Sequence, residues 1–401
     1  MIKTKISFIS YIPFLILISF ASFLNIIARV IFAPLTPYIC EEMHLCHAET
    51  GSLFFILSIG FAITLFGSQF LSSKITHKTT TIISIILTGF TLSLISCTET
   101  LSLLLCLFFF LGLCSGLFIP SAVAMIRETV PIEHLGKAFG IFATSQSVAF
   151  IIAPVAVKYF IAYFSWKNIS NGLGLFSSII SLGMIFFLKK GQTKGEPITL
   201  SFMRDVFCWP SFWILMILLC LANGLNIGIY NMAPDYFQCH NLLDANIMYK
   251  LTIIARVISV LTAILAGILA DRFGLKHSLA LSFIFGGVLT LLMGSMNPSS
   301  SLAIFCLQSP VATCLMPLIH FGVSTIAPPE KNAAIVSITA PFGFLFGGGI
   351  VPQVLGFLGD INMYAQGFIL FGTTSIVCGI IFNINAIYRH IELSQIKSEL
   401  E

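Results

Sequence analysis

The chain has 401 residues, of which 57% are hydrophobic and only 9% are charged, and its formal net charge is +4. Soluble domains carry about 25% charged residues. A water-soluble core could not hide this much apolar surface, whereas a lipid bilayer can solvate it. The composition therefore excludes an ordinary soluble protein and predicts an all-α protein that crosses the membrane many times.

About twelve apolar runs are long enough to cross a bilayer, which takes about 20 residues in a helix. The first run follows Lys3 and Lys5, and it is too long for a cleaved signal peptide, so we expect it to be the first membrane helix. The predicted helices lie near residues 11–39, 51–72, 80–97, 101–126, 137–163, 169–188, 209–233, 246–270, 277–295, 300–326, 332–357 and 363–387.

The runs divide into two halves of six. We predict an N-terminal half at 1–190, a polar cytoplasmic linker at 191–206, and a C-terminal half at 207–401 with a short cytoplasmic tail. An offset of 198 residues places Pro154 on Pro352, each late in a fifth helix. Parallel repeats of six helices, with a site near the midplane, are a known plan for secondary transporters.

The basic residues predict the orientation. With the N-terminus in the cytoplasm, fifteen of the twenty Lys and Arg residues lie on the inner side, as the positive-inside rule requires. The other five are Arg29, Lys158 and Arg256 within spans, and Lys167 and Lys250 at the outer edge. We therefore expect both termini in the cytoplasm and a location in the inner membrane of a bacterium-like cell.

The sequence resembles the major facilitator superfamily over essentially its whole length. The segment GILADRFGLK at 267–276 is similar to the family's loop motif, and Gly112 and Gly116 match its spaced glycines. Ala153-Pro154 resembles the Gly-Pro of its antiporter motif, without the flanking glycines. The first-half copy of the loop motif, at 69–78, departs from the family pattern. The resemblance implies the family's twelve-helix fold and transport by alternating access.

Two arginines within spans are the main candidates for substrate binding. Arg256 shares a helix face with Thr252 and Ser259, at the spacings that bring helical side chains together. Arg29 shares a face with Asn25, and its segment is similar to the first helix of organic-anion and phosphate-ester facilitators. That resemblance implies that Arg29 binds an anionic group. Alternatively, Arg256 bonds backbone carbonyls, and Arg29 extends toward water.

No Asp or Glu falls well inside a predicted span, so an anionic substrate would complete the neutralisation of the arginines. Guanidinium groups hold carboxylate, phosphate or sulfonate through paired hydrogen bonds. Gln146, Asn226 and Tyr230 lie in predicted pore-forming helices, where they either contact substrate or join helices. His320 either carries a coupling proton or forms a plain hydrogen bond.

The short turn containing Asp271, Arg272, Gly274 and Lys276 is expected to act as a gating latch at the inner surface. Pro341, Pro352 and Gly343 with Gly347–Gly349 predict a break in the eleventh helix. We find no catalytic constellation, metal-ligand spacing or phosphate-binding loop, and we expect no enzyme, no cofactor and no nucleic-acid partner. The sequence predicts a monomeric secondary transporter of a small organic or inorganic anion. The alternatives are an exporter of neutral metabolites or drugs and a transporter-like membrane sensor.

Overall fold

The computed structural model describes residues 8–188, 204, 207–208, 210–239, 245–324 and 332–384. The tail after residue 384 and the predicted linker, apart from Arg204, lie outside the described residues. Within the described ranges the chain is helical, with short turns and no strand, and eleven segments are long and apolar enough to cross a membrane. The prediction of an all-α membrane protein is confirmed.

The elements of the first part of the chain follow each other with short connections. They are η1 (Phe8–Tyr11), α1 (Ile12–Val30), α2 (Phe32–Met43), α3 (His47–Lys74), α4 (His77–Ile95), α5 (Leu101–Gly116), α6 (Phe118–Thr129), η2 (Ile132–His134), α7 (Leu135–Phe160) and α8 (Trp166–Phe187). Two predicted single helices, 11–39 and 101–126, are each interrupted by one residue, Ile31 and Leu117.

The remaining elements include two π-helical turns, η3 and η4. In order they are α10 (Pro210–Asn223), η3 (Gly224–Gly228), α11 (Ile229–Cys239), α12 (Ala245–Ser295), α13 (Pro298–Ser324), α14 (Asn332–Phe344), η4 (Leu345–Ile350), α15 (Val351–Asp360) and α16 (Tyr364–Ile384). The break predicted in the eleventh helix falls at η4, where a π-helical turn separates α14 from α15 while the backbone angles at Phe344, Ile350 and Val351 stay helical.

The two interruptions have the same local cause. Pro34 and Pro120 each stand three residues after the interrupting residue. A proline inside a helix has no N–H to donate, and its ring clashes with the carbonyl of the residue four positions earlier. The regular hydrogen bonding of the helix is therefore interrupted one turn before the proline, and each pair of segments still forms one long span.

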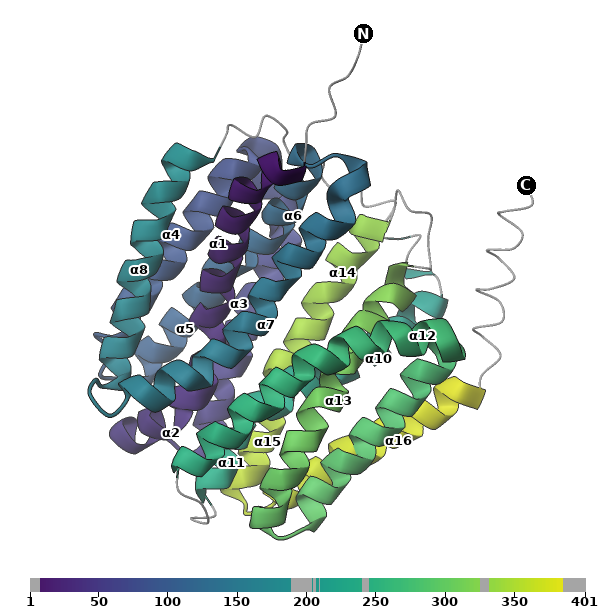
Figure 1. The fold of residues 1–401 in the computed structure, drawn as a ribbon. Coiled ribbons are helices and arrows are strands. Elements are labelled where there is room, and N and C mark those ends of the chain that lie inside the picture. Colours follow the sequence, from purple (N-terminus) through teal and green to yellow (C-terminus); the bar gives the residue numbers. More distant parts are fainter. Residues whose placement is uncertain are drawn as a thin grey trace, which may run out of the picture. The chain divides into compact units, whose positions relative to one another are not determined.

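Helix α12 joins the two predicted spans at 246–270 and 277–295. A straight helix of its 51 residues would be about 77 Å long, far more than the hydrocarbon core of a bilayer needs. Gly274 breaks it, with φ of 75° and ψ of 153°. Positive φ is readily adopted only by glycine. Figure 1 shows the result, two arms of α12 that run in opposite directions.

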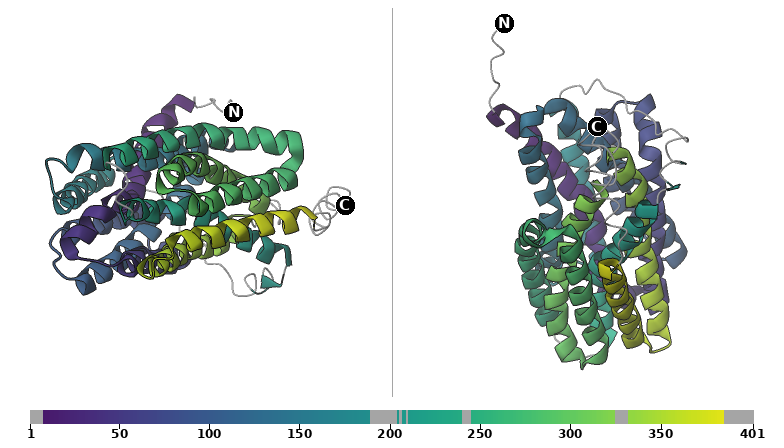
Figure 2. Two further views of the ribbon diagram at one scale, coloured as in Figure 1. Left: turned by 90° about the horizontal axis from the view of Figure 1, so that it is seen from below. Right: turned by 90° about the vertical axis from the view of Figure 1, so that its right-hand side faces the viewer.

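The described helices belong to two compact units. The first unit comprises residues 1–35 and 59–197, and the second comprises 36–58 and 198–401. In the first unit α4 packs against α8, and α1 packs against α7. In the second unit α12 packs against α13 and α16, which Figure 2 shows beside its two arms. Residues 36–58, from α2 and the start of α3, group with the second unit.

One glycine crossing repeats in both units. Gly89 of α4 faces Gly174 of α8, where a Cβ on Gly89 would lie 2.7 Å from the backbone oxygen of Gly174. Gly287 of α12 faces Gly372 of α16, where the corresponding distance is also 2.7 Å. Both members of the second pair stand 198 residues after their counterparts. The helices therefore touch through their backbones at equivalent points, which agrees with the predicted repeat.

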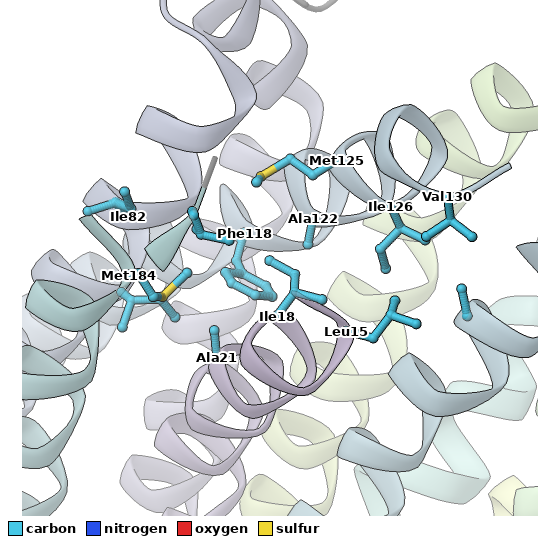
Figure 3. Packing of buried hydrophobic residues seen from close by; sticks show 13 residues of the cluster. Leu15, Ile18, Ala21, Ile82, Phe118, Ala122, Met125, Ile126, Val130 and Met184 are labelled. Atoms are coloured by element: carbon cyan, nitrogen blue, oxygen red, sulfur yellow. The ribbon is translucent and has the colours of Figure 1, made fainter. Parts of the chain in front are cut away.

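A cluster of apolar side chains fills the first unit beside this framework. Phe118, Leu15 and Ile18 are fully buried, and Met184 contributes from α8 (Figure 3). The cluster joins α1, α4, α6, α7 and α8. It fixes α1, and so the position of Asn25 and Arg29 within that unit.

Candidate functional site

Arg256 lies in the first arm of α12 and is 4% exposed. Its Nη1 donates a hydrogen bond of 3.1 Å to the side-chain oxygen of Asn226, and its Nη2 donates one of 3.4 Å to the Asn226 carbonyl. Its Cζ lies 4.1 Å from the centre of the Tyr230 ring. These partners are neutral, so they orient the guanidinium while it keeps its charge.

Asn226 is held by an unusual turn of backbone. It sits in the middle of η3, a π-helical turn, and such turns occur often at functional sites. The turn packs against η4, where a Cβ on Gly228 would lie 2.6 Å from the Gly347 oxygen. Thr313 of α13 also donates to the side-chain oxygen of Asn226, at 3.4 Å. The side-chain oxygen of Asn226 therefore accepts from both α12 and α13, while its own turn packs against η4.

The first arm of α12 presents two different faces. Thr252, Arg256 and Ser259 are buried, whereas Ile254, Val257 and Leu261 are exposed. The hydroxyls of Thr252 and Ser259 donate to carbonyls of their own helix, those of Met248 and Ala255. The arginine therefore points into the protein and the aliphatic side chains face outward, as expected for a helix in lipid.

Arg29 lies in the last turn of α1, in the first unit. It is half-buried, and its Cζ lies 4.2 Å from the centre of the Phe61 ring of α3. One turn earlier, Asn25 is fully buried and its Nδ2 donates to the Ser115 carbonyl at 3.1 Å. Asn25 thus joins α1 to α5.

Two other predicted residues lie apart from these contacts. Gln146 is exposed on α7 in the first unit, and His320 is exposed near the end of α13 in the second. In the second unit the structure brings Arg256 into contact with Asn226 and Tyr230. In the first unit it places Asn25 one turn from Arg29. Thr252 lies one turn from Arg256 on the same helix.

The predicted latch residues surround the kink of α12. Gly274 supplies the positive φ, and Ser278 closes the turn by donating to the Leu269 carbonyl at 2.9 Å. Arg272 is exposed and Lys276 is half-buried, while the side chain of Asp271 lies outside the described residues. In the first unit, Lys78 donates to the carbonyls of Ile185 and Leu188 and so caps the end of α8.

Sequence reasoning missed a polar cluster in the second unit. Asp235 is 4% exposed, and its Oδ2 accepts hydrogen bonds from Nδ1 of His47, at 2.8 Å, and from the hydroxyl of Tyr364. The predicted helix ended at residue 233, before Pro234, but α11 continues to Cys239. The extension buries a carboxylate that lies beyond the end of the predicted span. The sequence feature that could have indicated the longer helix is the apolar pair Tyr236-Phe237 beyond the proline.

The sequence profile of the Major Facilitator Superfamily matches residues 18–259. Among solved structures, a bacterial homologue of the human lysosomal transporter Spinster, inward-facing and occupied, is 13% identical with a TM-score of 0.74, covering 96% of each chain. The nucleoside transporter NupG is 15% identical with a TM-score of 0.74, covering 92% of this chain and 98% of its own. These likenesses concern the fold.

Three relatives match about two thirds of the chain. Multidrug resistance protein 2 of Bacillus subtilis is 26% identical over 63% of this chain and 65% of its own length. The cis,cis-muconate transport protein of Acinetobacter baylyi is 22% identical over 68% and 69%. The probable sulfoacetate transporter SauU of Cupriavidus necator is 22% identical over 62% of each. The match thus spans slightly less than two thirds of the Bacillus and Cupriavidus proteins.

Proposed function

Since the chain belongs to the Major Facilitator Superfamily, we propose that it is a secondary transporter that moves a small organic or inorganic anion across a membrane by alternating access. The family and its relatives indicate a transporter and not an enzyme. In this proposal Arg256 and Arg29 are the residues that bind the anion. Asn25, Gln146, Asn226, Tyr230 and Thr252 complete the binding residues.

The buried guanidinium of Arg256 is the observation that carries the proposal. A charged side chain within a span is costly, and such residues usually face a bundle interior or a water-filled path. The contacts with Asn226 and Tyr230 fix the plane of the guanidinium. A fixed guanidinium can hold carboxylate, phosphate or sulfonate through two parallel hydrogen bonds. The geometry therefore suits a planar or tetrahedral anion.

The relatives support both an anion and one alternative. Two of the three are named for anions, cis,cis-muconate and sulfoacetate. The Bacillus relative is named for multidrug resistance, and it favours export of neutral metabolites or drugs as the second candidate. In that case Arg256 and Arg29 serve only to hold helices together. A membrane sensor that binds ligand and signals to a partner is the third candidate.

We further propose the inner membrane of a bacterium-like cell, both termini in the cytoplasm and function as a monomer. The distribution of Lys and Arg supports the orientation, because cytoplasmic loops of membrane proteins carry an excess of these residues. In the same scheme the kink around Gly274, with Asp271, Arg272 and Lys276, works as the inner gate. His320 is the candidate for proton coupling.

Uptake into proteoliposomes tests the proposal. The purified protein is reconstituted and offered labelled muconate, sulfoacetate, a phosphate ester, a sugar and a cationic drug in parallel. We expect uptake of one or more anions, lost in Arg256→Gln and reduced in Arg29→Gln. Lys250→Gln is the matched control, because it removes one positive charge from an exposed position of the same helix α12.

The outcomes separate the three candidates. Anion uptake that persists in both arginine variants would show that the arginines do not bind the anion. Transport of neutral or cationic compounds alone selects the exporter. Ligand-induced thermal stabilisation, which reports binding to the folded state, without transport of any compound selects the sensor.

A further inference from the structure

A cavity of about 250 Å³ lies in the second unit where α2 and α11 end and α12 begins. Its wall is mainly aromatic and apolar, with rings from Tyr38, Tyr249 and Phe237 and the thioether of Met248. Tyr249, Phe237 and Met248 are buried, and Tyr38 is half-buried. Besides the hydroxyls of the two tyrosines, the polar groups of the lining residues are the carboxylate of Glu41 and the amide of Gln238, both on exposed residues.

The cavity is separate from the Arg256 site but lies on the same helix faces. Tyr249 stands seven residues before Arg256 on α12, and Phe237 stands seven residues after Tyr230 on α11. Seven residues are about two helical turns, or about 10 Å along the axis. The cavity therefore lies two turns from Arg256, toward the ends of α11 and α2. In the proposed orientation these ends face outward.

We propose that this cavity is a binding site for a small organic cation, a quaternary ammonium or alkylammonium group. Aromatic faces attract such cations, and several rings around one position form the usual cage for a quaternary ammonium. Glu41 supplies the opposite charge at the mouth. The described residues that line the cavity include no Lys, Arg or His.

The charges around the cavity are consistent with a cation. Glu42 follows Glu41, so the end of α2 is acidic. The nearest basic residue in sequence is Lys250, and successive side chains of a helix leave it about 100° apart, so Lys250 points away from the direction of Tyr249. Among the described residues that line the cavity, the charged side chain is therefore that of Glu41.

Calorimetric titration of the purified full chain with choline tests the site, and the uncharged isostere 3,3-dimethylbutan-1-ol is the matched ligand. Both compounds have the same shape, and only choline carries the charge. We expect choline to bind about five-fold or more tightly than the isostere. Equal affinity for the two compounds, or no choline binding, overturns the proposal.

Variants then place the site. Glu41→Gln and Tyr38→Leu are expected to weaken choline binding about five-fold or more, whereas Tyr38→Phe keeps the ring and the affinity. Glu42→Gln is the matched control, because it removes the neighbouring charge without lining the cavity. Equal weakening by Glu42→Gln and Glu41→Gln would reduce the effect to general surface charge and refute the site. Thermal melting confirms that each variant is folded.

This test does not depend on the anion transport proposed above. Arg256→Gln removes the proposed anion ligand but lines no part of the cavity, so choline affinity is expected to stay within two-fold of the wild-type value. A chain that binds choline but transports no anion would retain the cation site and lose the anion mechanism. If the chain transports an anion but does not distinguish choline from its isostere, the anion mechanism stands and the cation site is refuted.

Discussion

The glycine crossing of the first unit, Gly89 with Gly174, and that of the second, Gly287 with Gly372, correspond at the same offset of 198 residues. The surroundings of the two arginines do not correspond in this way. Arg256 is buried against an amide on a π-helical turn, whereas Arg29 is half-buried and adjoins the interruption of the helix at Ile31. The position 198 residues after Arg29 is Ile227, so the second unit carries its cation on another helix.

The difference indicates that the helix packing repeats between the two units, whereas the surroundings of the two arginines do not. A glycine crossing depends on two backbones approaching closely, and both units keep it because any side chain there would collide with an oxygen. The polar centres share only a local motif, a guanidinium over an aromatic ring, at 4.1 Å for Arg256 and 4.2 Å for Arg29. Stacking of this kind stabilises a cation without neutralising it. We expect equal responses to changes in the framework and unequal responses to changes at the arginines.

The largest effect is expected from Asn226→Asp. The change replaces the amide against Arg256 by a carboxylate, which would neutralise the guanidinium in place through a charge-assisted hydrogen bond. Anion affinity should fall about 100-fold or more, which corresponds to about 2.7 kcal/mol, while the folded state is retained. Isothermal titration with the transported anion measures the loss. Asn226→Gln keeps the neutral amide and serves as the control, and an equal loss in both variants would contradict neutralisation as the cause.

The framework can be tested in both units with one substitution. Gly174→Val and Gly372→Val each place a side chain against the backbone of the facing helix, and overpacking of this kind costs about 1–3 kcal/mol. We expect a similar fall in melting temperature in detergent for both variants. Gly183→Val, on the same helix as Gly174, meets nothing within 4 Å and should change the melting temperature little. A large loss in one unit alone would break the equivalence of the two crossings.

The sequence was sufficient to predict the helical membrane fold because hydropathy and helix length are local properties. The offset of 198 was visible from Pro154 and Pro352, although the crossing glycines became evident only from the structure. Helix ends near prolines were predicted poorly. The run at 209–233 was ended before Pro234, but α11 continues through this proline to Cys239.

Contacts between distant residues could not be predicted from the sequence. Arg256 was singled out because a cation in an apolar run is unusual, and Asn226 and Tyr230 because they are polar residues of a neighbouring span. Nothing in the sequence indicated that a π turn would bring that amide to the guanidinium. The buried Asp235 was missed for the same reason, since its partners His47 and Tyr364 lie 188 and 129 residues away.

Removal of the other arginine should have a smaller effect on transport than a change at Arg256. Arg29→Gln leaves the buried Asn25 in its hydrogen bond to the Ser115 carbonyl, so the first unit should keep its fold. Because Arg29 keeps more exposed surface than Arg256, we expect about a ten-fold loss of anion affinity, compared with about 100-fold for Arg256→Gln. Titration of both variants with the same anion gives the ratio. A larger loss for Arg29→Gln would reverse the ranking of the two centres.

The smallest effects are expected from the rings beneath the arginines. Tyr230→Leu and Phe61→Leu remove the aromatic face below Arg256 and Arg29, and a cation–π contact is worth about 0.5–2 kcal/mol, more when it is desolvated. Because Arg256 is the more buried cation, Tyr230→Leu should weaken anion binding about ten-fold and Phe61→Leu about three-fold. Tyr230→Phe keeps the ring and removes only the hydroxyl, so its affinity should stay near the wild-type value. If Tyr230→Phe weakens binding as much as Tyr230→Leu does, the hydroxyl and not the ring face contributes at Arg256, and the parallel between the two stacked cations no longer holds.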